Sequence, residues 1–230
     1  MNENVVAPDA PWFATYPPGV PHQPELSGCP VHRMLAEAAG RWPQRVAVSF
    51  MGRDLSYPEL DSLVSRAAAG LQQLGVGPGV NVGLYLPNTP HGIIAFLGVL
   101  RAGGVVVNYS PLDADRILEH KIGDSETDIM VTLDLQALLP RMTGFLGHSR
   151  LQKLVVGSVD EFAGQPEAVR AQLSEAGELA DVPADERIMS FASLLDNDGG
   201  YEHHGVADEL DALAVLQYTG GTTGAPKGAM

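Results

Sequence analysis

The residues best suited to chemistry lie near the end of the sequence, at positions 218–228, which read YTGGTTGAPKG. Glycines let the backbone approach a ligand closely, and successive backbone N–H groups can then converge on an anion. The threonine hydroxyls add hydrogen-bond donors, and the lysine adds a charge that suits phosphate. We therefore expect a phosphate-binding loop formed by Thr219, Gly220, Gly221, Thr222, Thr223, Gly224 and Lys227.

Other interpretations of this segment fit less well. A flexible glycine–threonine linker would account for the glycines, but not for a lysine placed directly after Pro226, whose ring fixes the local backbone. The Walker phosphate loop requires Gly-Lys followed by Ser or Thr, whereas Lys227 follows proline and precedes Gly228. The G-x-G-x-x-G fingerprint of dinucleotide-binding proteins does not fit either.

The elements that must position this loop form an alternating pattern of strands and helices. Apolar runs predict strands at 46–50, 55–57, 80–86, 105–107, 128–133, 151–156 and 213–216. Helical spacing predicts helices at 31–40, 58–74, 91–101, 114–123, 135–142, 166–176 and 191–195. The strand, helix and strand within 80–107 should make a right-handed crossover between parallel neighbours. We therefore predict an α/β fold of layered sheets with helices on both faces, with the loop at a carboxyl end of the strands.

Two regions depart from this alternation. Residues 1–30 are rich in proline, so we expect an arm laid over the surface, anchored by Trp12, Phe13 and Tyr16. Residues 158–211 carry most of the acidic excess, opposed there by Arg170 and Arg187 alone, and are expected to form a solvated face.

Composition excludes several classes of protein. The formal net charge of −14 argues against general binding of nucleic acid. No apolar run reaches membrane-spanning length and no signal peptide is recognised. Cys29 is the sole cysteine, so neither an internal disulfide nor a multi-cysteine metal site is expected. A reducing cytoplasm fits these features.

The histidines do not suggest a metal site. His203 and His204 follow Glu202, but adjacent residues of an extended chain point to opposite sides. Four others, expected to be surface or capped residues without a carboxylate partner, are His32, His91, His120 and His148. No G-x-S-x-G elbow is present, so a hydrolase triad has no starting point.

The segment 218–228 closely resembles the signature of the adenylate-forming enzymes, Tyr-Thr-Ser-Gly-Thr-Thr-Gly-x-Pro-Lys-Gly, with Gly220 where serine is commoner. The preceding Leu216 and Gln217 resemble the fatty acyl-CoA ligase branch of that family. Three further segments resemble others of the family in the same order: PWFATYPPGVP at 11–21, LSYPEL at 55–60 and VLRAGGVVVNYSPL at 99–112.

The resemblance implies an ATP-dependent long-chain fatty acyl-CoA ligase of the bacterial type, in which a carboxylate attacks the α-phosphate of ATP and coenzyme A then displaces AMP. ATP with Mg²⁺ would be bound through the candidate loop, and residues 31–230 would be the N-terminal part of the large AMP-binding domain. No catalytic residue is assignable within this chain, which we expect to be an inactive fragment lacking the C-terminal domain. A dicarboxylate or aromatic-acid ligase, a nucleotide-binding module without turnover and a structural fragment are the alternatives; a homodimer and peripheral membrane contact stay open.

Overall fold

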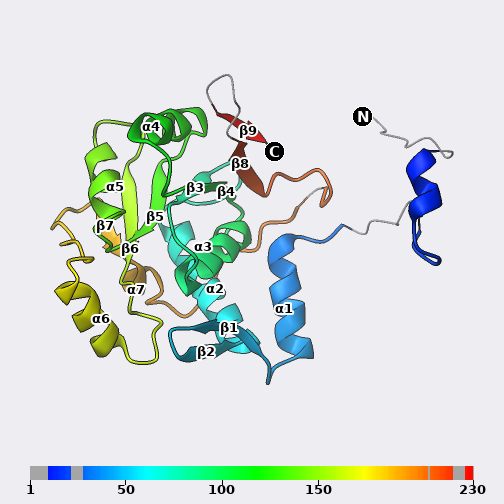
Figure 1. Ribbon diagram of the computed structural model, residues 1–230, viewed down its shortest axis with the longest axis horizontal. Coiled ribbons are helices and arrows are strands. Elements are labelled where there is room, and N and C mark those ends of the chain that lie inside the picture. Colours follow the sequence, from blue (N-terminus) through cyan, green and yellow to red (C-terminus); the bar gives the residue numbers. More distant parts are fainter. Residues whose placement is uncertain (1–9, 22–27, 207, 220–225, 230) are drawn as a thin grey trace.

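The computed structural model describes residues 10–21, 28–206, 208–219 and 226–229. Within them, one central sheet has the strand order β7-β6-β5-β3-β4-β8-β9 (Figure 1). Its strands are β3 (Asn81–Leu84), β4 (Val105–Asn108), β5 (Ile129–Leu133), β6 (Lys153–Gly157), β7 (Ile188–Ser190), β8 (Val215–Thr219) and β9 (Lys227–Ala229). All neighbours from β7 to β8 are parallel, and this confirms the predicted α/β class.

The expected crossover is present: β3 and β4 pair in parallel and are joined by α3 (Pro90–Arg101). Two features of the sheet differ from the sequence expectations. The short strand β7 was not predicted. The lysine expected in a loop, Lys227, instead begins β9, which pairs antiparallel with β8. Both strands consist of three residues, too few for a periodic pattern to show.

Helices cover both faces of the sheet, as predicted (Figure 1). One face packs against α2 (Tyr57–Gln73), α3 and α7 (Phe191–Leu194), and the other against α4 (Asp115–Asp124) and α5 (Leu139–Phe145). Helix α2 begins with a capping box between Ser56 and Glu59. It ends before Gly75, whose φ of 93° suits glycine. Helix α5 begins four residues later than predicted, because Leu135 forms a β-bridge with Leu179 and residues 136–138 form a turn.

The hairpin of β1 (Val46–Phe50) and β2 (Arg53–Ser56) confirms the prediction for that segment. Helices α1 (Val31–Arg41) and α6 (Pro166–Glu175) also form where expected. The predicted apolar face of α1 is only partly correct. Leu35 is buried, whereas Val31 and Met34 are 42 % and 61 % exposed.

The proline-rich arm contains a short 3-10 helix, η1 (Pro11–Thr15). Figure 1 draws it apart from the α/β body, and Trp12 is 54 % exposed. The expected anchoring of this segment on the surface by Trp12, Phe13 and Tyr16 stays a prediction. Among the described residues, no helix is long and apolar enough to cross a membrane.

Candidate active site

Three tyrosines mark the carboxyl ends of three neighbouring strands. Leu84 of β3 pairs with Asn108 of β4, which in turn pairs with Gln217 of β8. The next residue of each strand or its extension is a tyrosine, so these three side chains point to the same face at the same level. We call this set the tyrosine row; its members are Tyr85, Tyr109 and Tyr218.

Each hydroxyl of the tyrosine row has a polar partner on the α4–α5 side. Tyr85 accepts a hydrogen bond from Arg141 at 2.7 Å. Tyr109 lies 2.9 Å from the hydroxyl of Ser125 and donates to Thr127 at 2.8 Å.

The third hydroxyl, of Tyr218, donates to Asp124 at 2.5 Å. Burial raises the pKa of all three tyrosines, and the Asp124 carboxylate raises that of Tyr218 further. The row is therefore neutral at ordinary pH and holds the strand ends by directed hydrogen bonds.

The candidate phosphate loop begins and ends beside this row. Thr219 is the last residue of β8, and its partner in the β8–β9 pairing is Lys227. Both are exposed at the carboxyl edge of the parallel strands. The structure thus brings the first and last predicted phosphate contacts opposite one another. The other predicted members, Gly220, Gly221, Thr222, Thr223 and Gly224, lie outside the described residues.

A small cavity of about 190 Å³ opens next to the loop. Lys121 lines it, and its Nζ lies 2.5 Å from Oδ2 of Asp113 and 5.3 Å from the ring centre of Tyr218, two further lining residues. The sequence analysis assigned no role to Lys121 or Asp113. The remaining lining residues are Asn108, Tyr109, Ser110, Gln217 and Pro226.

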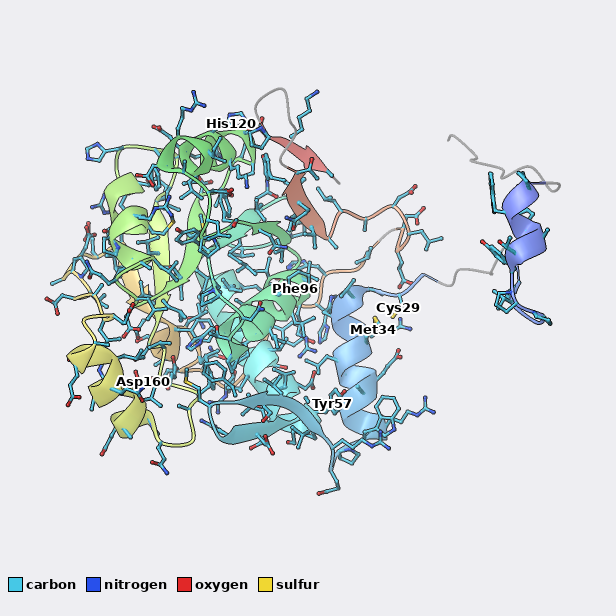
Figure 2. All side chains as sticks on the ribbon, in the orientation of Figure 1. Cys29, Met34, Tyr57, Phe96, His120 and Asp160 are labelled. Carbon is cyan, nitrogen blue, oxygen red and sulfur yellow. The ribbon has the colours of Figure 1, made fainter. Side chains whose placement is uncertain are left out.

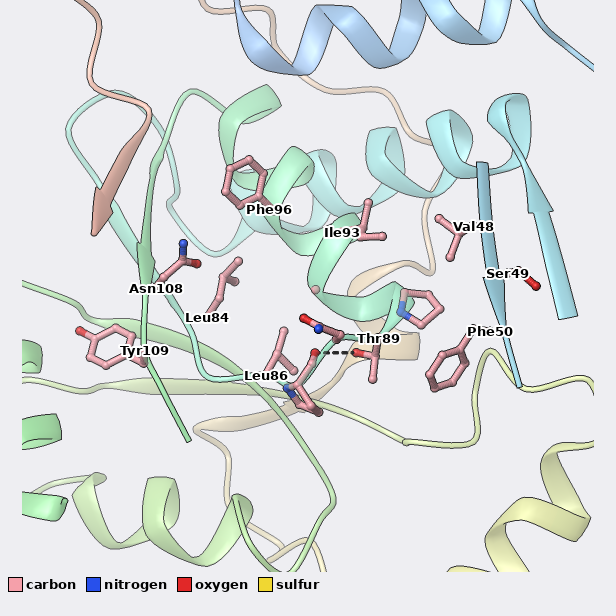
Figure 3. Close-up of a pocket in the computed structure, with 14 residues that line it drawn as sticks. Val48, Ser49, Phe50, Leu84, Leu86, Thr89, Ile93, Phe96, Asn108 and Tyr109 are labelled. Atoms are coloured by element: carbon pink, nitrogen blue, oxygen red, sulfur yellow. Dashed lines mark hydrogen bonds between the residues drawn. The ribbon is translucent and has the colours of Figure 1, made fainter. Parts of the chain in front are cut away.

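A larger cavity of about 540 Å³ adjoins the same edge (Figure 3). Most of its wall is apolar, from the β1–β2 hairpin, the end of β3 and the first turns of α3, and includes Val48, Phe50, Leu86, Ile93 and Phe96. Asn108 and Tyr109 line both cavities. An apolar space and a polar space therefore meet at the end of β4.

The histidines correct one expectation. His91 is not a surface residue: it is fully buried, and its Nε2 lies 3.1 Å from Oε2 of Glu161. The rings of Phe162 and Phe191 flank it at 4.7 and 5.0 Å between centres. Gly157 is required beside it, because a Cβ there would lie 2.5 Å from the imidazole. His91 thus joins α3 to the loop after β6.

Of the other histidines, His120 is exposed and places its Nε2 3.3 Å from the carbonyl oxygen of Pro226. His32 is half-buried, and burial together with the nearby Arg101 lowers its pKa. Within the part of the chain that the structure describes, no three histidine, cysteine or carboxylate side chains come close enough to hold a metal ion.

Comparison with known proteins gives a consistent result. A family model described as AMP-binding enzyme matches residues 35–230. The long-chain-fatty-acid–CoA ligase of Bacillus subtilis (strain 168) is 34 % identical over 223 residues, which are 96 % of this chain and 39 % of that protein. Syringomycin synthase SyrB1 of Pseudomonas syringae pv. syringae is 30 % identical, over 89 % of this chain and 27 % of its own. The chain thus spans less than half the length of these curated relatives.

Solved structures show the same fold. The anthranilate CoA ligase AuaEII, in complex with anthranoyl-AMP, superposes with a TM-score of 0.70 at 19 % identity, covering 89 % of this chain and 35 % of that one. MbtA of Mycobacterium smegmatis, in its apo form, has a TM-score of 0.66 at 28 % identity, covering 88 % of this chain and 33 % of that one.

Proposed function

Because the chain belongs to the AMP-binding enzyme family, we propose that it is the N-terminal part of a longer ligase that uses ATP to activate a carboxylic acid as its acyl-adenylate and then transfers the acyl group to coenzyme A. The observation that carries the proposal is the pairing of Thr219 with Lys227 at the carboxyl edge of the parallel sheet. Ligands of such sheets bind at that edge. The glycines and threonines between the two residues supply donors for phosphate oxygens.

The loop would act by stabilising negative charge that develops during the reaction. Attack of the acid on the α-phosphate releases pyrophosphate, whose negative charge must be stabilised as it leaves. In the proposal, Lys227 neutralises part of that charge, and Thr219, Thr222 and Thr223 donate hydrogen bonds, as do the backbone N–H groups of Gly220, Gly221 and Gly224. Among the described residues no group of three histidine, cysteine or carboxylate side chains could hold a metal ion, and we assign no step to Mg²⁺.

A long-chain fatty acid is the favoured substrate. The apolar cavity of about 540 Å³ beside Asn108 suits an acyl chain. The 34 % identity to a protein named long-chain-fatty-acid–CoA ligase supports the same choice. An aromatic acid is the second candidate, since Phe50 and Phe96 line the cavity and could stack on a ring. A dicarboxylate would leave one charge against an apolar wall, and is disfavoured.

The test uses the whole protein that contains this chain, with adenylation measured as ATP–pyrophosphate exchange. Replacement Lys227→Ala should lower kcat/KM for ATP by about 100-fold, as removal of a group that stabilises transition-state charge does. Lys153→Ala is the matched control. Lys153 is likewise an exposed lysine in a strand, but it lies at the amino edge of the sheet, away from the proposed site. Exchange at an undiminished rate in the Lys227 variant would refute the proposal.

Three further measurements separate the alternatives. A panel of palmitate, benzoate and adipate, scored by AMP release, ranks the acid classes, and palmitate should be preferred. ATP binding without exchange for any acid would instead identify a nucleotide-binding module without turnover. The 230-residue chain alone should form no acyl-CoA, and product formation by it would contradict its assignment as a part of the ligase.

A further inference from the structure

We propose that one face of helix α4 positions both ends of the phosphate loop: Asp124 holds the start through Tyr218, and His120 holds the end through Pro226. This inference rests on the proposed function of the loop. His120 and Asp124 are four residues apart and therefore share a helix face. They are positioning residues, since their contacts are to the protein.

The start of the loop is held through the ring of Tyr218, the residue before Thr219. Its hydroxyl donates to Oδ2 of Asp124 at 2.5 Å. The ammonium group of Lys121 lies 5.3 Å from the ring centre. Across the hairpin, a Cβ on Gly228 would lie 3.4 Å from the ring. The buried ring is thus fixed by α4 and by β9, and its neighbour Thr219 has little freedom to shift.

The end of the loop is held through the backbone. His120 Nε2 lies 3.3 Å from the carbonyl oxygen of Pro226, to which it can donate a hydrogen bond. Figure 2 shows His120 on the side of α4 that faces β9. Pro226 directly precedes Lys227, the first residue of β9. This contact and the pairing of Lys227 with Thr219 therefore fix the backbone position from which the lysine side chain projects.

Helix α4 can serve as a support because it is itself firmly attached. Leu118 and Ile122 are fully buried against the sheet, and Lys121 pairs with Asp113 on the loop before the helix. At the other end, Ser125 hydrogen-bonds to Tyr109, the middle member of the tyrosine row. Movement of the loop ends relative to the sheet would therefore have to break contacts to a helix that is itself packed against the sheet.

The experiment measures the KM for ATP, the KM for the acid and kcat in pyrophosphate exchange by the whole protein. Asp124→Ala and Tyr218→Phe should each raise the KM for ATP about tenfold, the effect of one charge-assisted hydrogen bond. The KM for the acid should change less than twofold. The double variant should be no worse than either single one, because both remove the same bond.

His120→Ala should raise the KM for ATP about threefold, the effect of one exposed neutral hydrogen bond. His120→Gln should restore much of it, because the glutamine side-chain N–H can also donate. Glu119→Ala, an exposed change on the same helix, is the control and should alter nothing. A role in folding alone would lower the melting temperature and leave the KM for ATP of the folded enzyme unchanged.

Three results would overturn the inference: an unchanged KM for ATP in Asp124→Ala, multiplicative effects in the double variant, or equal loss in His120→Gln and His120→Ala. Asp124 is exposed, so the Asp124→Ala variant should fold even if the Tyr218→Phe variant, changed at a buried residue, does not. The Asp124→Ala variant therefore suffices for the test. If Lys227→Ala also leaves kcat/KM for ATP unchanged, the proposed function fails. If only the α4 variants are without effect, the positioning role alone fails.

Discussion

The two faces of the central sheet are built from different chemistry. The face under α2 and α3 is mostly aliphatic, with fully buried residues such as Val64, Leu71, Ile94 and Val106. Its main exception is the cluster of His91, Phe162 and Phe191 near α7. The face under α4 and α5 contains the tyrosine row, and each of its hydroxyls hydrogen-bonds to a side chain of α5, of α4 or of the turn after α4. The same strands form both faces, because successive side chains along a strand point to opposite sides of the sheet.

Because of this difference, the two faces should contribute differently to the stability of the fold and to the positions of the strand ends. Aliphatic packing contributes in proportion to the area it buries and is largely indifferent to direction. A buried hydrogen bond holds two atoms at one distance and angle, and costs stability if it is left unmade. The α2–α3 face should therefore determine how firmly the domain folds. The tyrosine face should determine where the carboxyl ends of β3, β4 and β8 lie, and it is at those ends that the candidate site is found.

The largest expected effect comes from the aliphatic face. Ile94→Ala should lower the free energy of unfolding by about 3 kcal/mol, because Ile94 is fully buried and the cavity left behind cannot close completely. Urea denaturation of the 230-residue chain measures this. Ile93→Ala is the matched control: Ile93 is the adjacent residue and 40 % exposed, so its loss should be well under half as large. Equal losses would show that burial of Ile94 against the sheet does not stabilise the domain as described.

On the tyrosine face, replacement of Arg141 should lower the stability less than Ile94→Ala does, but should disturb the neighbouring loop more. Its guanidinium donates to the hydroxyl of Tyr85, to the backbone oxygens of Pro111 and Asp113, and to the carboxylate of Asp115. Arg141→Ala should lower the free energy of unfolding by about 2 kcal/mol, and should accelerate amide hydrogen exchange in residues 110–114.

Arg141→Lys provides the sharper version of this test. Lysine keeps the charge but lacks the planar fork of donors, so it should recover little of the lost protection. A lysine variant with wild-type exchange rates would mean that charge alone holds the loop, and that the directed character attributed to the tyrosine face is wrong for this residue.

The sequence predicts the aliphatic face far better than the tyrosine face. Helical spacing of Leu60, Val64 and Leu71 gave the position of α2, and the apolar run 105–107 gave β4. These signals are local, since each element carries its own pattern. The parallel pairing of β3 and β4 also followed, because a single connecting helix determines it.

Features that depend on distant residues were missed. The tyrosine row requires the register of three strands, and the pairing Asn108↔Gln217 joins residues 109 positions apart. His91 was taken for a surface or capped residue because its partner, Glu161, is 70 positions away. Strand β9 exists only through its pairing with β8. No periodicity within a short window could have shown any of these contacts.

The smallest effect tests whether directed polar contacts also hold the outer part of the carboxyl edge. After β6, Asp160 accepts hydrogen bonds from Ser158 at 2.5 Å and from Arg170 at 3.0 Å, and Arg170 also reaches Asp134 at 3.0 Å. Burial pushes the pKa of Asp160 upward, but the hydrogen bonds from Ser158 and Arg170 outweigh it and hold that pKa below its ordinary value.

A depressed pKa in the folded state means that Asp160 stabilises the fold when ionised. Its contribution should be complete above roughly pH 5 and should be lost as the pH falls below the unfolded value of about 3.9. Asp160→Asn should therefore lower the free energy of unfolding by about 1 kcal/mol at pH 7, and by less at pH 3, in urea titrations. The exposed Glu167→Gln, on α6 with Arg170, should show no such difference. A constant effect of Asp160→Asn across this pH range would mean that the contact acts through packing, as on the aliphatic face, and the contrast between directed and undirected contacts would not extend beyond the tyrosine row.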